Sequence, residues 1–259
     1  AAHNIDLDFL QKSMPKDGSV HLSDKTNQYG VFVLAGPNAR SVLQKIADAD
    51  ISNESFKWLS MQEIPIGFCP KVRAMRVNFV GSLGWELHHP IEYQLQLFEA
   101  LQEAGAEFEI KNVGMRAMDS MRLEKSYRLW GTDLNAENSA LEANLHRFIK
   151  LNKGEFTGRQ ALVEQQEQGV PNKFCTIEIE ANDADSFGNE PIIIDGKVVG
   201  RGTSGGYGHF IRKSLMLGYI ESGHANIGQE CEVRLLDKLL PAKIIAESPY
   251  DPENIALKA

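Results

Sequence analysis

The sequence predicts an α+β domain followed by a small antiparallel β-barrel domain. Before about residue 150, helical apolar stripes occur between strands whose apolar residues alternate with polar ones. After that point short strands dominate, and Asp195-Gly196 joins two of them with the residues that a type I′ hairpin turn needs. We therefore expect a first domain over residues 1–150 and a second over residues 151–259, with the border between 150 and 172.

Five elements are expected in the first domain besides the strand that carries Glu86 and His88. Apolar runs or alternation predict the strands, and apolar residues at three- and four-residue spacing predict the helices. Asn38 is a plausible N-cap for the first helix. Leu95 and Phe98 are expected in the apolar stripe of the second helix, and Met115, Met118 and Met121 are expected to be core filler in the third. In chain order, the elements are a strand at 29–34, a helix at 38–46, a strand at 71–80, a helix at 93–104 and a helix at 114–126.

The second domain is expected to open with one helix, at residues 158–168, and then to continue in strands. Residues 192–199 form the predicted hairpin. Further strands at 173–180, 215–220, 230–236 and 241–246 complete a small barrel or sandwich.

Composition narrows the classes of partner. The chain has 259 residues, is 42% hydrophobic and carries a formal net charge of −8, so a nucleic-acid backbone is a poor partner. No apolar run approaches the roughly 18 residues that span a bilayer, and the polar start predicts no signal peptide. Cys69, Cys175 and Cys231 are far apart and odd in number, which favours three buried thiols over disulfides or zinc.

The segment Val77–His88 is the strongest candidate for a binding site. A strand is expected to run into the turn Gly81-Ser82-Leu83-Gly84, and the next strand places Glu86 and His88 on one face. With Phe79 across the turn, a carboxylate, an imidazole and an aromatic ring could form one wall of a pocket. A solvated glutamate on an exposed hairpin is the alternative.

Other motifs are less informative. Residues 200–205 match Gly-x-Gly-x-x-Gly, but no helix is expected to follow them, so a Gly-rich crossing between barrel strands is favoured over a dinucleotide site. The seven histidines show no metal-ligand spacing, and no nucleophile motif is found. Arg116 and Arg122 can each pair with Asp119 in a surface row, and Arg147 either extends to solvent or faces an anion.

Four motifs together resemble the tetrahydrofolate-binding aminomethyltransferase family. This family includes the glycine cleavage T-protein and the folate-binding C-terminal halves of dimethylglycine and sarcosine dehydrogenases. The resemblance covers nearly the whole chain and implies the same fold class, an α+β domain followed by a barrel. Its motifs are Gly-x-x-Gly-Trp-Glu-Leu at 81–87, Met-Arg-Leu-Glu-Lys at 121–125, Leu-Asn-Lys-Gly-Glu-Phe-x-Gly-Arg-x-Ala-Leu at 151–162 and Thr-Ser-Gly-Gly-Tyr at 203–207.

The resemblance implies roles for five residues in binding tetrahydrofolate. The glutamate that matches Glu86 hydrogen-bonds the amino-pyrimidine edge of the pterin, a directional, charge-assisted contact. Phe79 and His88 stand where the dehydrogenase branch usually has tyrosine, and Arg147 stands where it has an aromatic residue near the folate. T-proteins have a substrate-binding arginine at the position of Met118, a role that Arg116 could take from two positions earlier.

The resemblance also implies what lies outside this chain. The family's catalytic aspartate falls upstream of the matching region, so the catalytic residue is unknown, and we expect the isolated chain to be inactive. In the dehydrogenase branch, FAD is held by an upstream flavin domain and the partner is a small methylamine or aminomethyl donor. No metal, nucleic acid or membrane is implied. The expected location is the cytoplasm, or the mitochondrial matrix if the source is eukaryotic.

The function expected from the resemblance is one-carbon transfer to tetrahydrofolate. A folate-dependent O- or S-demethylase and a non-catalytic folate-binding module are the alternatives. A bound flavin in the intact protein would favour the dehydrogenase branch.

Overall fold

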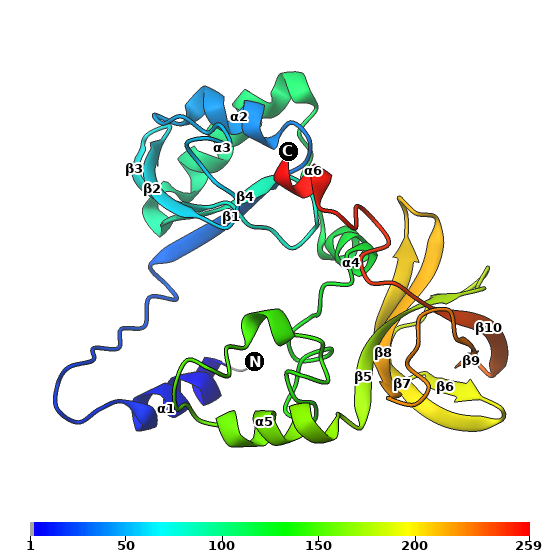
Figure 1. The fold of residues 1–259 in the computed structure, drawn as a ribbon. Coiled ribbons are helices and arrows are strands. Elements are labelled where there is room, and N and C mark those ends of the chain that lie inside the picture. Colours follow the sequence, from blue (N-terminus) through cyan, green and yellow to red (C-terminus); the bar gives the residue numbers. More distant parts are fainter. Residues whose placement is uncertain (1–2) are drawn as a thin grey trace.

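The computed structural model describes residues 3–259, and its first layered unit is a four-stranded antiparallel sheet with two helices on one face (Figure 1). The strands lie in the order β1-β4-β3-β2. Helices α2 and α3 cover one face of this sheet. The elements of this unit are β1 (Tyr29–Ala35), α2 (Ala39–Ile46), β2 (Met61–Ile66), β3 (Cys69–Met75), β4 (Gly84–Pro90) and α3 (Gln94–Gly105).

The two faces of the sheet differ because the side chains of a strand alternate between faces. Leu34, Trp85 and Leu87 point toward the helices and join Leu43 and Leu101 in one buried cluster. The opposite face is uncovered: Val31 and Val33 are exposed and Glu86 and His88 are half-buried. We call it the open sheet face; in Figure 1 it is turned toward the centre of the molecule.

The second unit is a closed six-stranded antiparallel barrel in the order β10-β5-β8-β7-β6-β9. It confirms the fold class expected from the sequence, an α+β part followed by a small barrel. Asp195 and Gly196 both have positive φ angles, 51° and 74°, as a type I′ turn requires. The strands are β5 (Asn172–Ile179), β6 (Pro191–Ile194), β7 (Lys197–Gly208), β8 (Lys213–Glu221), β9 (Glu230–Leu235) and β10 (Lys238–Ile245).

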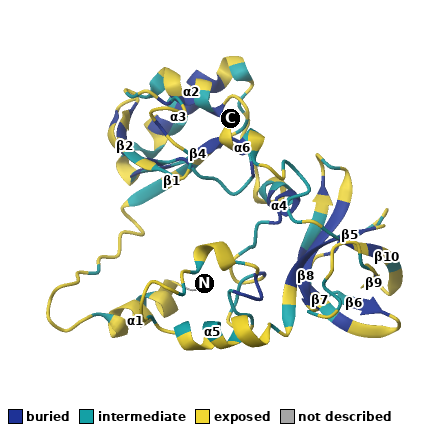
Figure 2. Ribbon diagram, in the orientation of Figure 1, coloured by how far each residue is buried: buried dark blue, intermediate teal, exposed yellow. Residues whose placement is uncertain are grey.

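Within residues 3–259, four further α-helices lie outside these two units. Helix α4 (Met115–Glu124) stands between sheet and barrel, while α1 (His3–Ser13) and α5 (Arg159–Gln168) lie below the open centre of the molecule in Figure 1. Neither α1 nor α5 has a buried residue, and both are drawn almost wholly as exposed or half-buried in Figure 2. After β10 the chain returns to the first unit, where it ends in α6 (Ile255–Lys258).

The expected strand at 71–80 is too long, because β3 ends at Met75. The side-chain oxygen of Asn78 accepts the amides of Val80 and Gly81, both at 2.9 Å, which bends the backbone away from the sheet. Phe79 therefore lies in an irregular segment and not on a strand opposite Glu86.

Four smaller expectations are also corrected. Residues 200–208 are part of strand β7 and not a crossing between strands. Leu95 and Met115 are exposed, so neither contributes to a core. Asn38 precedes α2 as expected, but its side chain makes no capping hydrogen bond. By contrast, Cys69, Cys175 and Cys231 are all buried free thiols, as predicted.

Candidate functional site

Glu86 and His88 lie side by side on the open sheet face, as the two-residue spacing predicts. The Nε2 atom of His88 is 3.2 Å from Oε2 of Glu86, and both side chains are about one-third exposed. In the register of the sheet, Glu86 pairs with Val33 on one side and with Met75 on the other. The carboxylate is thus flanked by two apolar side chains, a surface suited to a flat ligand with a polar edge.

A cavity of about 790 Å³ opens beside this face, where the first unit, the segment 125–148 and the chain end meet. Phe79 and Tyr127 both line it and stack on each other, with ring centroids 5.9 Å apart and planes inclined by 24°. Burial raises the pKa of the Tyr127 hydroxyl, which keeps it a neutral donor. We call this cavity the junction pocket; among its lining residues are Trp58, Leu59, Val77, Phe79, Lys125, Tyr127, Arg147, Phe148, Asn254 and Leu257.

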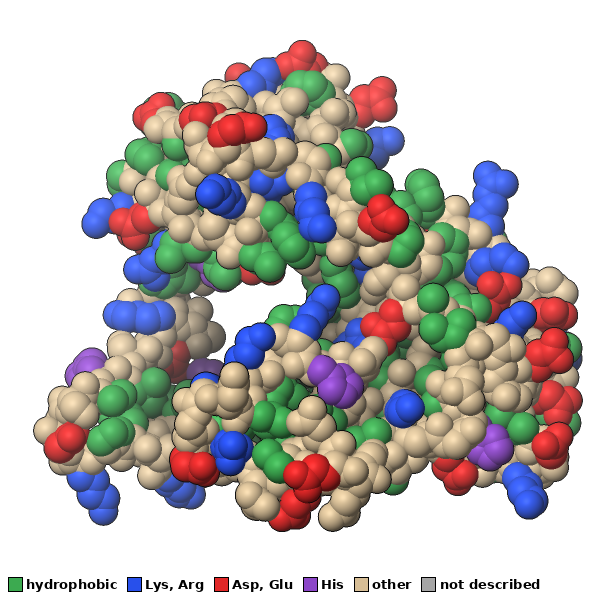
Figure 3. Space-filling view, viewed as in Figure 1, with side chains coloured by type: hydrophobic (Ala, Val, Ile, Leu, Met, Phe, Trp, Pro, Cys, Tyr) green, Lys and Arg blue, Asp and Glu red, His purple; other side chains and the backbone are tan. Residues whose placement is uncertain are grey.

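The pocket and the open sheet face adjoin at the end of β3. Met75 pairs with Glu86, and Val77, two residues further on, lines the pocket. Figure 3 shows the molecule hollowed at its centre, below the sheet and beside the segment around α4. One wall of the pocket thus begins two residues along the chain from Met75, the cross-strand neighbour of Glu86.

The five residues expected to contact folate fall into three places. Glu86 and His88 are together on the open sheet face, and Phe79 and Arg147 both line the junction pocket. The guanidinium of Arg147 lies 4.7 Å from the ring centroid of Phe148, which also lines the pocket. Arg116 is exposed at the start of α4 and belongs to neither group.

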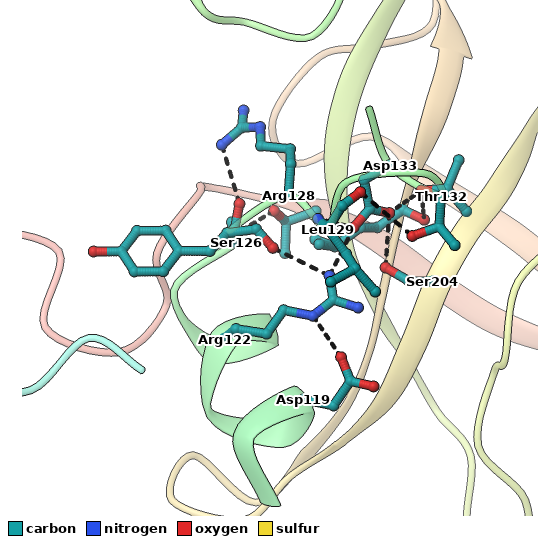
Figure 4. A network of polar contacts seen from close by, with 12 residues as sticks. Asp119, Arg122, Ser126, Arg128, Leu129, Thr132, Asp133 and Ser204 are labelled. Carbon is teal, nitrogen blue, oxygen red and sulfur yellow. Dashed lines mark hydrogen bonds and ion pairs between the residues drawn. The ribbon is translucent and has the colours of Figure 1, made fainter. Parts of the chain in front are cut away.

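The row of surface ion pairs expected on α4 is instead a buried network (Figure 4). Arg122 is only 1% exposed; it donates to Asp119 at 2.8 Å and to Asp133 at 2.7 Å. Asp133, fully buried, also accepts the Leu129 amide at 2.8 Å, the Ser204 hydroxyl at 2.7 Å and the Thr203 hydroxyl. Arg122 and Asp133 thus fix segment 127–134, which includes pocket residues, against helix α4 and strand β7.

The rest of the motif at 121–125 is equally structural. Glu124 is buried and accepts the backbone amides of Phe210 at 2.7 Å and Ile211 at 3.1 Å, which ties α4 to the barrel. Lys125 is buried too, and its ammonium donates to the segment after β10. The three charged residues of this motif therefore join helix α4 to segment 127–134, to the barrel and to the segment after β10.

Sequence reasoning missed Asp133, Lys125 and Tyr127. Asp133 follows Gly131-Thr132 in a stretch without periodicity, and nothing in the sequence places it beside Arg122. A useful signal was the charge density of Met-Arg-Leu-Glu-Lys at 121–125, because three charges within five residues in an apolar environment need partners from elsewhere in the fold.

The residues of this chain do not fit a flavin at the Gly-x-Gly-x-x-Gly match. Residues 200–205 lie inside strand β7, and strand β8 rather than a helix follows, so no helix N-terminus faces a phosphate there. Within residues 3–259, no three His, Cys, Asp or Glu side chains gather as a metal site would require. No helix in the same range is both long and apolar enough to cross a membrane.

The fold and the site define a class: a sheet-and-barrel protein with a half-buried carboxylate on an uncovered sheet face and an aromatic-lined pocket. Two family models match the chain in order: the GCVT N-terminal domain at residues 1–153 and the glycine cleavage T-protein C-terminal barrel domain at residues 172–251. The chain belongs to this aminomethyltransferase (T-protein) family.

Curated relatives include both branches named above. Human mitochondrial dimethylglycine dehydrogenase is 41% identical over 244 residues, which is 93% of this chain and 28% of that protein. Aminomethyltransferase of Desulfitobacterium hafniense (strain DSM 10664 / DCB-2) is 31% identical over 251 residues, 96% of this chain and 67% of that protein. The chain thus spans little more than a quarter of its dehydrogenase relative.

A solved structure supports the same fold. The crystal structure of glycine cleavage system aminomethyltransferase T from Bartonella henselae superposes with a TM-score of 0.82 at 21% identity. The match covers 97% of this chain and 67% of that one. At this identity the likeness concerns the fold alone.

Proposed function

We propose that this chain is the folate-binding part of an enzyme that transfers a one-carbon unit to tetrahydrofolate. The observation that supports this most is the position of Glu86, a half-buried carboxylate between Val33 and Met75 with His88 at 3.2 Å. A carboxylate accepts two parallel N–H bonds from an amino-pyrimidine edge, and the apolar neighbours can contact the flat face of a pterin. Family membership supports the same assignment.

In this proposal, the chain's contribution to the reaction is binding and orientation. Glu86 fixes the pterin edge, and His88 restricts the carboxylate to one orientation. Phe79, Tyr127 and Arg147 receive the part of the folate that extends into the junction pocket. Holding the acceptor amine against the donor carbon replaces an encounter in solution by a pre-oriented one.

The donor is proposed to be a methylamine or aminomethyl compound, because both the dehydrogenase and the aminomethyltransferase relatives match most of the chain. The acid–base group and any flavin are assigned to parts of the protein outside the matched region. If the source is eukaryotic, the mitochondrial relatives support a matrix location. Boundaries near 150 and 172 remain our proposal for the two domains.

Calorimetric titration of tetrahydrofolate into wild type and Glu86→Gln tests the assignment. Loss of a charge-assisted pair should cost about 1.5–3 kcal/mol, which corresponds to roughly 10- to 150-fold weaker binding. Glu63→Gln is the control, because Glu63 lies on the exposed edge of the same sheet, 3.6 Å from Arg73. Binding by Glu86→Gln within twofold of wild type would rule out the proposed role of this residue.

The donor can be assigned separately with the intact protein. Methylene transfer from a methylamine would support the proposal, whereas transfer from only O- or S-methyl compounds would favour a demethylase. Folate binding without transfer from any of these donors would leave the non-catalytic module as the better account.

A further inference from the structure

The last ten residues cross from the barrel to the first unit and form one wall of the junction pocket. We call Tyr250–Ala259 the C-terminal strap; it is the red segment that ends in α6 in Figure 1. Asn254 and Leu257 both line the pocket, and Leu257 is buried. Asp251 orders the strap internally, because its carboxylate accepts the amides of Ile255 at 2.7 Å and Ala256 at 3.1 Å.

Lys125 holds the strap at its start. Its ammonium donates to the carbonyls of Tyr250 at 3.2 Å and Asp251 at 2.7 Å, and to Oδ1 of Asn254 at 2.9 Å. These bonds use all three N–H groups of the ammonium on one ten-residue segment. Lys125 is only 1% exposed, so water cannot hydrate its ammonium. The three hydrogen bonds to the strap take the place of that hydration.

Gly81 leaves the space through which this side chain passes. A Cβ added at Gly81 would lie 2.5 Å from Cδ of Lys125 and closer still to Cγ. These atoms are in the middle of the lysine side chain, whose far end is fixed by the three bonds, so the lysine has little freedom to move aside. The first glycine of the Gly81-x-x-Gly84 motif thus accommodates Lys125.

The other end of the strap is also held by a buried cation. Arg76, at the end of β3, donates to the carbonyl of Phe56 at 2.7 Å and to that of Lys258 at 3.0 Å. The Lys258 ammonium lies 5.2 Å from the ring centroid of Trp58, a pocket residue. Arg76 and Lys125 therefore bracket the part of the strap that faces the pocket.

We propose that Gly81 and Lys125 are positioning residues: they hold the C-terminal strap closed as a wall of the junction pocket. The strap contacts the pocket through Asn254 and Leu257, so releasing it removes a wall and lowers the affinity of the pocket for its ligand. The closure rests on contacts within this chain; the step from closure to ligand affinity rests on the proposed function, with tetrahydrofolate as the probe.

Hydrogen exchange of the strap, followed by mass spectrometry, tests closure without any ligand. Gly81→Ala should raise exchange of the peptide covering residues 250–259 by about tenfold, as expected for local opening. Gly196→Ala is the matched control, because Gly196 has the same φ of +74° but nothing within 4 Å of an added Cβ. The control should leave strap exchange unchanged, and an equally small change in Gly81→Ala would overturn the proposal.

A second pair of variants separates steric from polar effects. Lys125→Met keeps most of the apolar stem but removes the three donors, so it too should speed strap exchange by about tenfold. In a Lys125→Ala background the added methyl of Gly81→Ala has no lysine stem to contact, and its extra effect should fall to that of Gly196→Ala. Wild-type strap exchange in Lys125→Met would overturn the proposal even if Gly81→Ala failed to fold.

Tetrahydrofolate titration of the same variants tests the last step. Affinity should fall about tenfold in Gly81→Ala and Lys125→Met and stay within twofold of wild type in Gly196→Ala. An open strap with unchanged affinity would overturn the link between the strap and the pocket. Absence of folate binding by the wild type would refute both the proposed function and the link between the strap and ligand affinity. The hydrogen-exchange result would still decide whether Gly81 and Lys125 hold the strap closed.

Discussion

Replacing Asp133 by alanine is expected to destabilise the folded protein by about 3–5 kcal/mol, because it leaves the buried Arg122 without its second carboxylate. The carboxylate of Asp133 is fully buried and accepts four hydrogen bonds. After the substitution the hydroxyls of Thr203 and Ser204 can turn to other acceptors. The Leu129 amide loses its acceptor, and Nη1 of Arg122 keeps only the Tyr127 carbonyl, at 3.1 Å, for its two N–H groups. An unsatisfied buried donor costs about 1–3 kcal/mol, more when charged.

Asp119→Ala is the matched control, because Asp119 also binds Arg122, with N···O of 2.8 Å against 2.7 Å for Asp133. Its side chain is 48% exposed, however, so water can replace it, and the expected cost is at most about 1 kcal/mol. The contrast between these two variants measures the effect of burial at nearly constant geometry.

Urea unfolding at neutral pH, followed by circular dichroism with m-values compared between variants, gives the free energies. The double substitution Arg122→Met with Asp133→Leu should recover much of the loss, since an apolar pair of similar volume is often tolerated. Equal costs for Asp133→Ala and Asp119→Ala, or a cost below about 1 kcal/mol for Asp133→Ala, would refute the reasoning.

Three further expectations concern buried thiols and a buried phenol. Burial raises the pKa of the Cys175 thiol to about 12 and that of Cys231 to about 11, so between pH 9 and 11 the unfolded chain loses protons that the folded chain keeps. The free energy of unfolding should therefore fall as pH rises above 9, and Cys175→Ala should make this fall shallower in urea unfolding at several pH values. Tyr219→Phe removes a hydroxyl that donates to the Asp133 carbonyl at 2.8 Å and should cost about 1 kcal/mol in the same assay. Burial raises the pKa of Tyr219 to about 12 and also raises that of Tyr127, so ultraviolet titration should show fewer ionised phenols in the native protein than in the unfolded chain at the same alkaline pH.

Most elements could be predicted because their signals are local. The Asp195-Gly196 turn, the buried faces of α2 and α3 and the barrel strands follow from periodicity and turn chemistry over a few residues. Strand β3 was predicted too long because the alternation of apolar residues continues past Met75. The Asn78 side chain, which bends the backbone there, competes with the sheet through contacts that periodicity does not describe.

The candidate site could be predicted only in part. Two-residue spacing on one strand is enough to place Glu86 beside His88, because strand geometry fixes that relation. No such rule relates Phe79 to Tyr127 or Lys125 to Asn254, which are 48 and 129 positions apart in the numbering and meet only when the units assemble.

The sequence by itself therefore determined the class of fold, the family resemblance and the pairing of Glu86 with His88. Tertiary structure alone decided that Arg122, Glu124 and Lys125 are buried and which groups they bind. The physical reason is that a charge can be buried only where several acceptors converge on it, and those acceptors come from distant parts of the chain.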